Sequence, residues 1–166
     1  MRLVLSVLLL VAGLSSADAQ SGRIDRFDRI KAGIMKYESL SSTVNDNIST
    51  GKIVRGQGIK IVDVTRNIPA KDGTLFGVEV AVVGGPKGSK APVKILWRYP
   101  QPGLKSPTTG TTKFTDEYVD TVTIGNTFEF HWSLGAEWTL VPGTWTLEVS
   151  QDDRKLLVQD FVLTKP

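Results

Sequence analysis

The chain contains a single histidine, His131, so any acid–base pair or triad that needs an imidazole must use it. Glu129 lies two positions earlier, which places both side chains on the same face of an extended segment. A carboxylate beside an imidazole can orient it as a general base. The alternative, which we favour, is that both are polar residues on the solvent-facing side of an antiparallel strand.

A second group that could do chemistry is acidic. Asp116, Glu117, Asp120 and Glu129 lie near one another in the sequence. Two carboxylates roughly 5 to 10 Å apart could hydrolyse a glycosidic bond. Because Asp and Glu side chains are almost always exposed, we interpret these residues as solvated loop and strand positions. A polysaccharide-acting hydrolase stays open as an alternative.

Three short motifs match known sites only in part. Residues 45–51 resemble a calcium loop, but Gly56 stands where the closing glutamate belongs. Ser49 and Lys52 have the Ser-x-x-Lys spacing of penicillin-binding enzymes without the companion motifs. Residues 84–90, GGPKGSK, lack P-loop spacing, and we expect a hairpin turn there. With one histidine and no cysteine, we expect no metal and no cofactor.

The strongest candidate site is electrostatic. From Ala81 to Thr115 there is no Asp or Glu, whereas Lys and Arg occur six times. Lys94 and Arg98 share a strand face because their spacing is even. We predict a positive patch made of Lys87, Lys90, Lys94, Arg98 and Lys105. Its ligand would be an anionic envelope polymer or an acidic protein partner, and the alternative is an ordinary solubilising surface.

Strands must position all of these side chains. Apolar and polar residues alternate over 76–82, 93–99, 128–132 and 145–149, which indicates half-buried strands separated by Gly- and Pro-rich turns. We expect the four tryptophans on these segments to pack in the core rather than to stack on sugars. Strands at about 144–150 and 155–163 should form a hairpin. No long helical segment separates the strands, so an antiparallel sandwich or barrel is favoured over a parallel α/β fold.

The segments before residue 58 are less regular. Residues 23–37 mix near-helical and alternating spacing, and we expect a short turn or helix followed by a strand. Residues 39–52 are rich in Ser, Thr and Asn and are expected to form a loop.

The first nineteen residues are typical of a cleavable signal peptide. Arg2 precedes an apolar stretch from Leu3 to Leu14, and the small-residue sequence at 17–19 predicts cleavage after Ala19. The apolar stretch is too short for a membrane-spanning helix, which needs roughly 20 residues. The lack of cysteine excludes disulfides and a lipidated cysteine. A net charge of +3 disfavours nucleic acid as a partner.

Four landmarks occur in order along the mature chain: NIPAKDGTLFGVEV at 67–80, GGPKG at 84–88, RYPQPG at 98–103 and EWTLVPGTWTLEV at 137–149. With them, the segment from about Ile30 to Leu163 resembles a family of small bacterial exported domains of unknown function. The resemblance implies an immunoglobulin-like β-sandwich in the periplasm and brings no active-site residues with it.

We therefore expect an all-β protein, an antiparallel immunoglobulin-like β-sandwich of about seven or eight strands preceded by a signal peptide. Residues 1–19 are the leader, 20–57 a segment with the first strand and a polar loop, and 58–166 the remainder of one domain. The expected location is the periplasm or the exterior of a bacterium. The expected function is non-catalytic binding of an anionic ligand or acidic partner. The alternatives are the hydrolase and an inhibitor or chaperone that pairs through a sheet edge.

Overall fold

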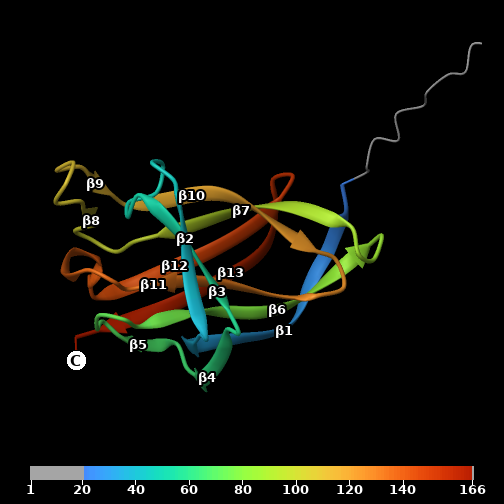
Figure 1. The fold of residues 1–166 in the computed structure, drawn as a ribbon, viewed down its shortest axis with the longest axis horizontal. Helices are drawn as coiled ribbons and strands as arrows, with labels where there is room; N and C mark the ends of the chain where they lie inside the picture. The colour runs from blue at the N-terminus through green and yellow to red at the C-terminus, as the bar shows by residue number, and fades with distance from the viewer. Residues whose placement is uncertain (1–20, 166) are drawn as a thin grey trace, which may run out of the picture.

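Two β-sheets pack face to face in the computed structural model, which describes residues 21–165 (Figure 1). The predicted leader at 1–19 lies outside the described residues. Within 21–165 the two sheets hold four and five strands, in the orders β11-β6-β1-β4 and β10-β7-β12-β13-β5. All pairings in these two sheets are antiparallel except that of β13 with β5. The predicted antiparallel sandwich is confirmed, with short β5 among the strands beyond the expected seven or eight.

The elements have the following bounds. The four-stranded sheet consists of β11 (Thr127–Ser133), β6 (Leu75–Gly85), β1 (Arg23–Lys36) and β4 (Lys60–Val64). The five-stranded sheet consists of β10 (Thr115–Thr123), β7 (Lys90–Arg98), β12 (Gly143–Gln151), β13 (Arg154–Thr164) and β5 (Asn67–Pro69). Two small ribbons pair β2 (Ser39–Val44) with β3 (Lys52–Gln57) and β8 (Leu104–Lys105) with β9 (Thr112–Lys113). One 3-10 turn, η1, covers Glu137–Thr139.

Aromatic side chains fill the space between the sheets. Phe76 on β6 contacts Trp97, Trp145 and Phe161 edge-on, with ring centroids 5.7, 6.0 and 5.1 Å away. Each ring lies on the buried face of its strand, where every second side chain points into the core. The alternation in the sequence predicted this for Phe76, Trp97 and Trp145. The prediction that tryptophans pack in the core is confirmed for Trp97, Trp132 and Trp145. The fourth tryptophan, Trp138, is only partly buried.

The first strand differs from its prediction. Residues 23–36 form one continuous strand rather than a turn or helix followed by a strand. Its pairing with β6 shifts register between Ile24 and Arg26 and again between Asp28 and Lys31. Each bulge adds a residue without changing the buried face, so Ile24 and Phe27 both face the core at a spacing of three. That spacing imitates a helical period.

The segment predicted as a loop is a β-hairpin. Only residues 45–51 are a loop, and the rest of 39–52 forms β2 and the start of β3. All six residues of β2 are exposed, so the strand has no buried face to give its sequence an apolar alternation. In Figure 1 this hairpin crosses the sandwich at a steep angle to the strands of both sheets.

The connection at 84–90 also differs from its prediction. It joins β6 of one sheet to β7 of the other, so it crosses between the layers and is not a hairpin turn. The predicted C-terminal hairpin is confirmed, because β12 and β13 pair antiparallel from Gly143 with Leu163 to Gln151 with Arg154. No helix within 21–165 has the length and apolar character needed to cross a membrane.

Candidate functional site

The tip of the β2–β3 hairpin is fixed to the five-stranded sheet by a buried carboxylate. Asp116 at the start of β10 accepts hydrogen bonds from the Ser49 backbone N–H at 2.7 Å, the Ser49 hydroxyl at 2.8 Å and the Tyr99 hydroxyl at 2.8 Å. The neighbouring Ile48 is buried in the core. Lys113 donates to the Asn47 carbonyl at 2.7 Å. These contacts hold the loop against the body of the domain.

The same loop is shaped by local hydrogen bonds. The Asn45 side chain accepts from the Asn47 backbone N–H at 3.0 Å, and the Asn45 backbone N–H donates to the Gly51 carbonyl at 2.9 Å. Gly51 has a φ of +70°, which glycine adopts without steric cost. Asn45 and Gly51, which made residues 45–51 resemble a calcium loop, therefore form the turn of the hairpin.

A bidentate ion pair fixes the second strand of the hairpin. Arg55 on β3 donates to both carboxylate oxygens of Asp120 on β10, at 2.7 and 3.1 Å. Hydrogen bonding to this carboxylate raises the pKa of Arg55. Asp116 and Asp120 lie four residues apart on β10, so the hairpin is attached to this strand at two points. From β10 the hairpin extends towards β11 of the other sheet.

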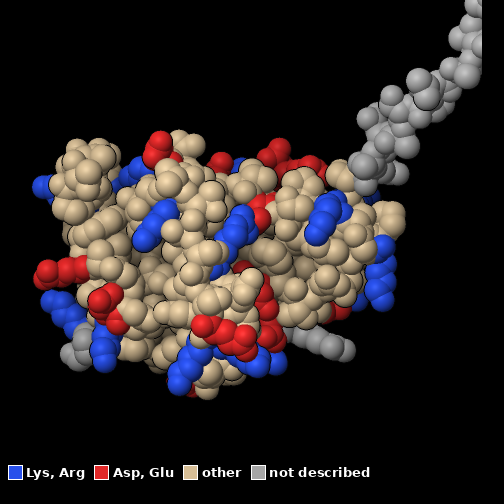
Figure 2. All heavy atoms as spheres, viewed as in Figure 1, with Lys and Arg blue, Asp and Glu red and all other residues tan. Residues whose placement is uncertain are grey.

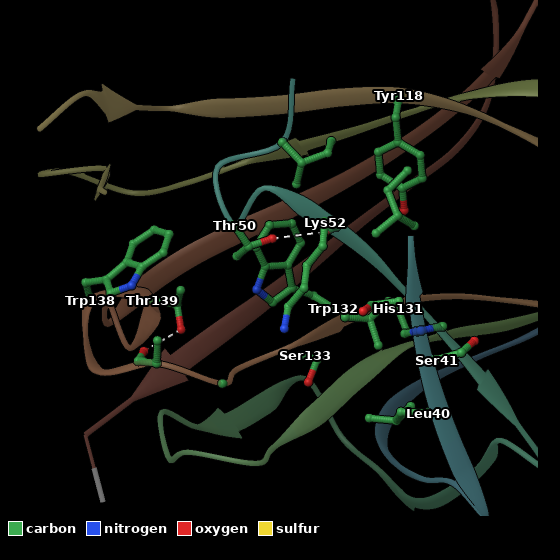
Figure 3. A pocket seen from close by; sticks show the side chains of 16 residues that line it. Leu40, Ser41, Thr50, Lys52, Tyr118, His131, Trp132, Ser133, Trp138 and Thr139 are labelled. Atoms are coloured by element: carbon green, nitrogen blue, oxygen red, sulfur yellow. Dashed lines mark hydrogen bonds between the residues drawn. The ribbon is translucent and has the colours of Figure 1, made fainter. Parts of the chain in front are cut away.

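A cavity of about 440 Å³ lies beneath the hairpin. It is bounded by β2 and β3, by the edge strands β10 and β11, and by the segment around η1 (Figure 3). Its volume is within the range of pockets that hold small molecules. The apolar side chains of its wall are Leu40, Ile48, Ile53, Val54, Trp132, Ala136 and Trp138.

Lys52 and Trp132 each bring a nitrogen donor to this cavity. Lys52 on β3 makes no ion pair with any described residue, and its side chain is exposed. Trp132 on β11 is 7% exposed, and its Nε1 has no hydrogen-bond partner among the described residues. In Figure 3 both nitrogens are turned towards the middle of the cavity.

Three of the six hydroxyl groups of the described lining donate hydrogen bonds to backbone carbonyls. Thr139 donates to the Ala136 carbonyl at 2.6 Å, Thr50 to the Lys52 carbonyl at 3.0 Å and Ser41 to the Arg55 carbonyl at 3.4 Å. Tyr118 directs its hydroxyl towards the cavity in Figure 3. Burial raises the pKa of Tyr118, so its phenol keeps its proton. Among the described residues, the lining contains no Asp or Glu.

His131 lines both this cavity and a smaller one of about 160 Å³. It pairs across the sheet with Gly77, where a Cβ would lie 2.1 Å from the Phe130 carbonyl oxygen, so β11 approaches β6 closely. Neither imidazole nitrogen has a hydrogen-bond partner within 21–165, and burial lowers the pKa of His131. The solvent-facing position expected from the sequence is wrong, because the hairpin covers this face.

The carboxylates of the alternative hydrolase are used in other ways. Asp116 anchors the hairpin loop, Asp120 pairs with Arg55, and Glu117 lies 3.7 Å from Lys94 on the outer face. Glu129 lines the smaller cavity and faces Glu79 across the sheet. Burial and the charge of Glu79 raise the pKa of Glu129. The carboxylate of Glu129 makes no hydrogen bond to His131, so the pair is not arranged as a base with its orienting carboxylate.

The residues of the predicted basic patch lie along β7 and beyond its two ends. Lys90, Lys94 and Arg98 share the outer face of the five-stranded sheet. Lys94 lies 3.7 Å from Glu117 and Arg98 4.0 Å from Glu148, so carboxylates of the neighbouring strands face both. Lys87 precedes β7, and Lys105 follows it on β8. A binding role for these residues stays a prediction. On the face drawn in Figure 2, acidic and basic side chains are interspersed.

The cavity was missed at the sequence level. Its lining comes from five separate segments, and its lysine and indole belong to strands that do not pair with each other. Ser49 and Lys52 did stand out, for a catalytic spacing that the structure does not use: Ser49 binds Asp116, whereas Lys52 borders the cavity. Within 21–165 no three His, Asp or Glu side chains lie close enough together to hold a metal ion.

Comparisons with known proteins give a family match and a solved structure with a similar fold. The model of a family described as a domain of unknown function (DUF3859) matches residues 25–163. An immunoglobulin-like protein from Pseudomonas aeruginosa has a similar structure, with a TM-score of 0.62 and 25% sequence identity over 89% of this chain and 99% of its own. A β-glucosidase from Listeria innocua aligns at 9% identity with a TM-score of 0.37, over 80% of this chain and 16% of its own. None of the curated proteins matches the chain.

Proposed function

Since the chain belongs to the DUF3859 family of domains of unknown function, whose name assigns no activity, we propose its function from its own cavity. The protein is an exported, non-catalytic binding module of the bacterial cell envelope, and its ligand is an anionic small molecule that lies beneath the β2–β3 hairpin. The observation that carries this proposal is the cavity of about 440 Å³ itself, walled by aromatic and aliphatic side chains and bordered by the unpaired ammonium of Lys52.

Electrostatics favour an anionic ligand. A charged ammonium beside a lining that contains, among the described residues, no carboxylate gives the cavity a positive potential. The nearest buried carboxylate, Asp116, is already neutralised by three hydrogen bonds and by Lys113, 3.7 Å away. A ligand with a negative group therefore gains attraction without facing a repelling partner.

A binding role is favoured over catalysis because the groups that could act as acids or bases have other tasks. Asp116 and Asp120 hold the hairpin. No carboxylate of the described residues is hydrogen-bonded to His131 to orient it, and burial is the main cause of its lowered pKa. In the described lining, no serine, threonine or tyrosine hydroxyl is hydrogen-bonded to His131, so the imidazole is not paired with a nucleophile.

Export is the second part of the proposal. It rests on the predicted leader at 1–19, on the absence of cysteine, and on the resemblance to exported bacterial domains. Fractionation of the native cells and N-terminal sequencing of the protein test it. We expect the protein outside the cytoplasm, with Gln20 as its first residue. A cytoplasmic protein that still begins with Met1 would disprove export.

A variant with a filled cavity tests the binding role. Ala136 lines the cavity in an extended backbone conformation, so Ala136→Phe should occupy the space with little strain. The matched control is Thr144→Phe, which adds the same ring at an exposed position of β12. Each protein is equilibrated with small-molecule extract of the native envelope, and bound compounds are identified by native mass spectrometry.

We expect wild type and Thr144→Phe to retain the same small molecule and Ala136→Phe to lose it, with all three melting at similar temperatures. Retention of that molecule by Ala136→Phe would place the site elsewhere. If the wild type retains nothing above the level of a heat-denatured sample, the binding role is wrong.

A further inference from the structure

The positive charge of the cavity indicates an anionic ligand, and its nitrogen donors indicate which anionic group that ligand carries. This inference rests on the proposed binding role. A buried indole N–H without a partner costs free energy because it can only donate, so it calls for an acceptor. The Trp132 Nε1 is such a donor, and Lys52 supplies an ammonium that can donate to the same group.

Within residues 21–165, the Trp132 indole N–H donates to no acceptor, and Lys52 makes no ion pair. The Ala136 and Lys52 carbonyls already accept from Thr139 and Thr50. Asp120 and Arg55 line the smaller cavity, where both oxygens of Asp120 accept from Arg55. A ligand that carries an acceptor would pair with both donors at once.

The donor set fits a carboxylate better than a phosphate. Phosphate sites combine arginine forks, several backbone N–H groups or a helix N-terminus, which together balance nearly two negative charges. The described lining contains no arginine, and Arg55 next to it is committed to Asp120. The adjacent η1 is a single turn of three residues, too short to provide the N-terminal anion site of a helix. One ammonium and one indole N–H match a single negative charge.

The remaining wall selects the body of the ligand. Trp138 and the Trp132 ring stand on the side of β11 and η1, and Leu40, Ile48 and Ile53 on the side of the hairpin. An aromatic or aliphatic group between these walls would lose its contact with water without leaving polar groups unpaired. Because the Lys52 side chain is exposed, we expect the charged group of the ligand to lie near the opening of the cavity.

We infer that the cavity binds a monocarboxylate with an apolar, ring-sized body, whose carboxylate accepts hydrogen bonds from Lys52 Nζ and Trp132 Nε1. The body lies between Trp138 and the hairpin. The hairpin is then the element that completes the site, because it contributes both the lysine and one apolar wall.

Four probes that share one body test this inference: phenylbutyrate, phenylbutyl phosphate, phenylbutanol and phenylbutylamine. Affinity is measured by calorimetry, and the indole N–H signals are followed by ¹H–¹⁵N NMR with the ¹⁵N-labelled protein. Trp145 provides an internal reference, since its Nε1 already donates to the Val141 carbonyl at 2.9 Å. The matched variants are Lys52→Gln and Lys60→Gln, which remove the same charge inside and outside the site.

We expect phenylbutyrate to bind most tightly and to shift the Trp132 indole proton downfield while the Trp145 signal stays in place. Lys52→Gln should weaken binding about ten-fold, the size of one partly exposed charged hydrogen bond, and Lys60→Gln should leave it unchanged. The alcohol should bind weakly and the amine more weakly still.

Two failures are distinguishable. If the phosphate or the alcohol binds as tightly as phenylbutyrate, or if the Trp132 signal does not move, the carboxylate inference is wrong while the cavity remains a binding site. If no probe binds and Ala136→Phe retains the same extract compounds as wild type, the proposed function fails together with it.

Discussion

The carboxylate of Asp116 accepts two hydrogen bonds from Ser49, which lies 67 positions earlier in the chain. One comes from the backbone N–H and the other from the hydroxyl, so the pair fixes both the position and the orientation of the hairpin loop. Asp116 is 1% exposed. Because a buried carboxylate must be fully paired to be tolerated, this contact ties the cavity wall to the stability of the core.

Replacement of Asp116 by Ala should destabilise the protein by about 3 kcal/mol, because it leaves the Ser49 N–H and the Tyr99 hydroxyl without acceptors in a buried place. Urea unfolding measures the change. Glu117→Ala on the same strand is the control, since Glu117 is exposed and should change stability by less than about 0.5 kcal/mol. Equal effects of the two substitutions would show that Asp116 does not anchor the loop.

The buried imidazole predicts a loss of stability in acid. Burial holds the pKa of folded His131 below its ordinary value, although the backbone oxygens of Glu129 and Val54 and the charge of Asp120 favour the protonated ring; Arg55 opposes it. As pH falls below about 6.5, the unfolded chain takes up the proton first, so the free energy of unfolding decreases by up to about 1.4 kcal/mol per pH unit. The decrease ends at the folded pKa.

His131→Gln removes this titration and keeps a polar side chain of similar reach. We expect the difference in unfolding free energy between wild type and the variant to be constant above pH 7 and to change below about pH 6.5, in the direction that disfavours the wild type. Urea titrations at a series of pH values provide the measurement. A difference independent of pH would mean that the ring is neutral, or solvated, in both states.

Glu129 predicts the opposite dependence. Burial, with the charge of Glu79 opposite, raises the pKa of Glu129, so the folded state holds this proton more tightly and loses stability as pH rises through the carboxyl range. Lys31 lies 3.3 Å from Glu79 and offsets only part of that charge. Glu129→Gln should therefore stabilise the protein by about 0.5 kcal/mol at neutral pH, the usual size of a cross-strand charge effect.

The gain from Glu129→Gln should disappear at acid pH, where the wild-type carboxyl is protonated. Glu117→Gln serves as the comparison, because Glu117 faces Lys94 rather than another acid and should lose a little stability or none. Chemical denaturation at acid and neutral pH separates the two. A destabilised Glu129→Gln at neutral pH would contradict the assigned repulsion.

The predicted basic patch is tested by charge reversal. One variant changes Lys87, Lys90, Lys94 and Arg98 to Glu, and a matched control changes three lysines and one arginine outside it, namely Lys36, Lys60, Arg66 and Lys71. We expect the first variant to bind purified anionic envelope polymer more weakly than the control, with phenylbutyrate binding unchanged in both. Identical polymer binding by the two variants would remove the patch as a ligand surface.

Alternation along the chain was enough to predict the sandwich, the aromatic core and the C-terminal hairpin. In each of these strands one face is buried, and burial forces apolar residues into every second position. The predictions failed for β1 and β2, where the alternation is interrupted or absent. The bulges of β1 produced a spacing of three between Ile24 and Phe27, and β2 has no buried face at all.

By itself the sequence therefore determined a cysteine-free chain and an all-β architecture, because composition and period depend on neighbours along the chain. The leader at 1–19 stays a prediction from the sequence. Only the tertiary structure decided that Asp116 holds Ser49, that His131 is covered, and that Lys52 and Trp132 border one cavity. These residues meet because a mostly polar hairpin crosses from one sheet edge towards the other. The contacts between these distant segments depend on that crossing, so the order of residues within any one segment does not predict them.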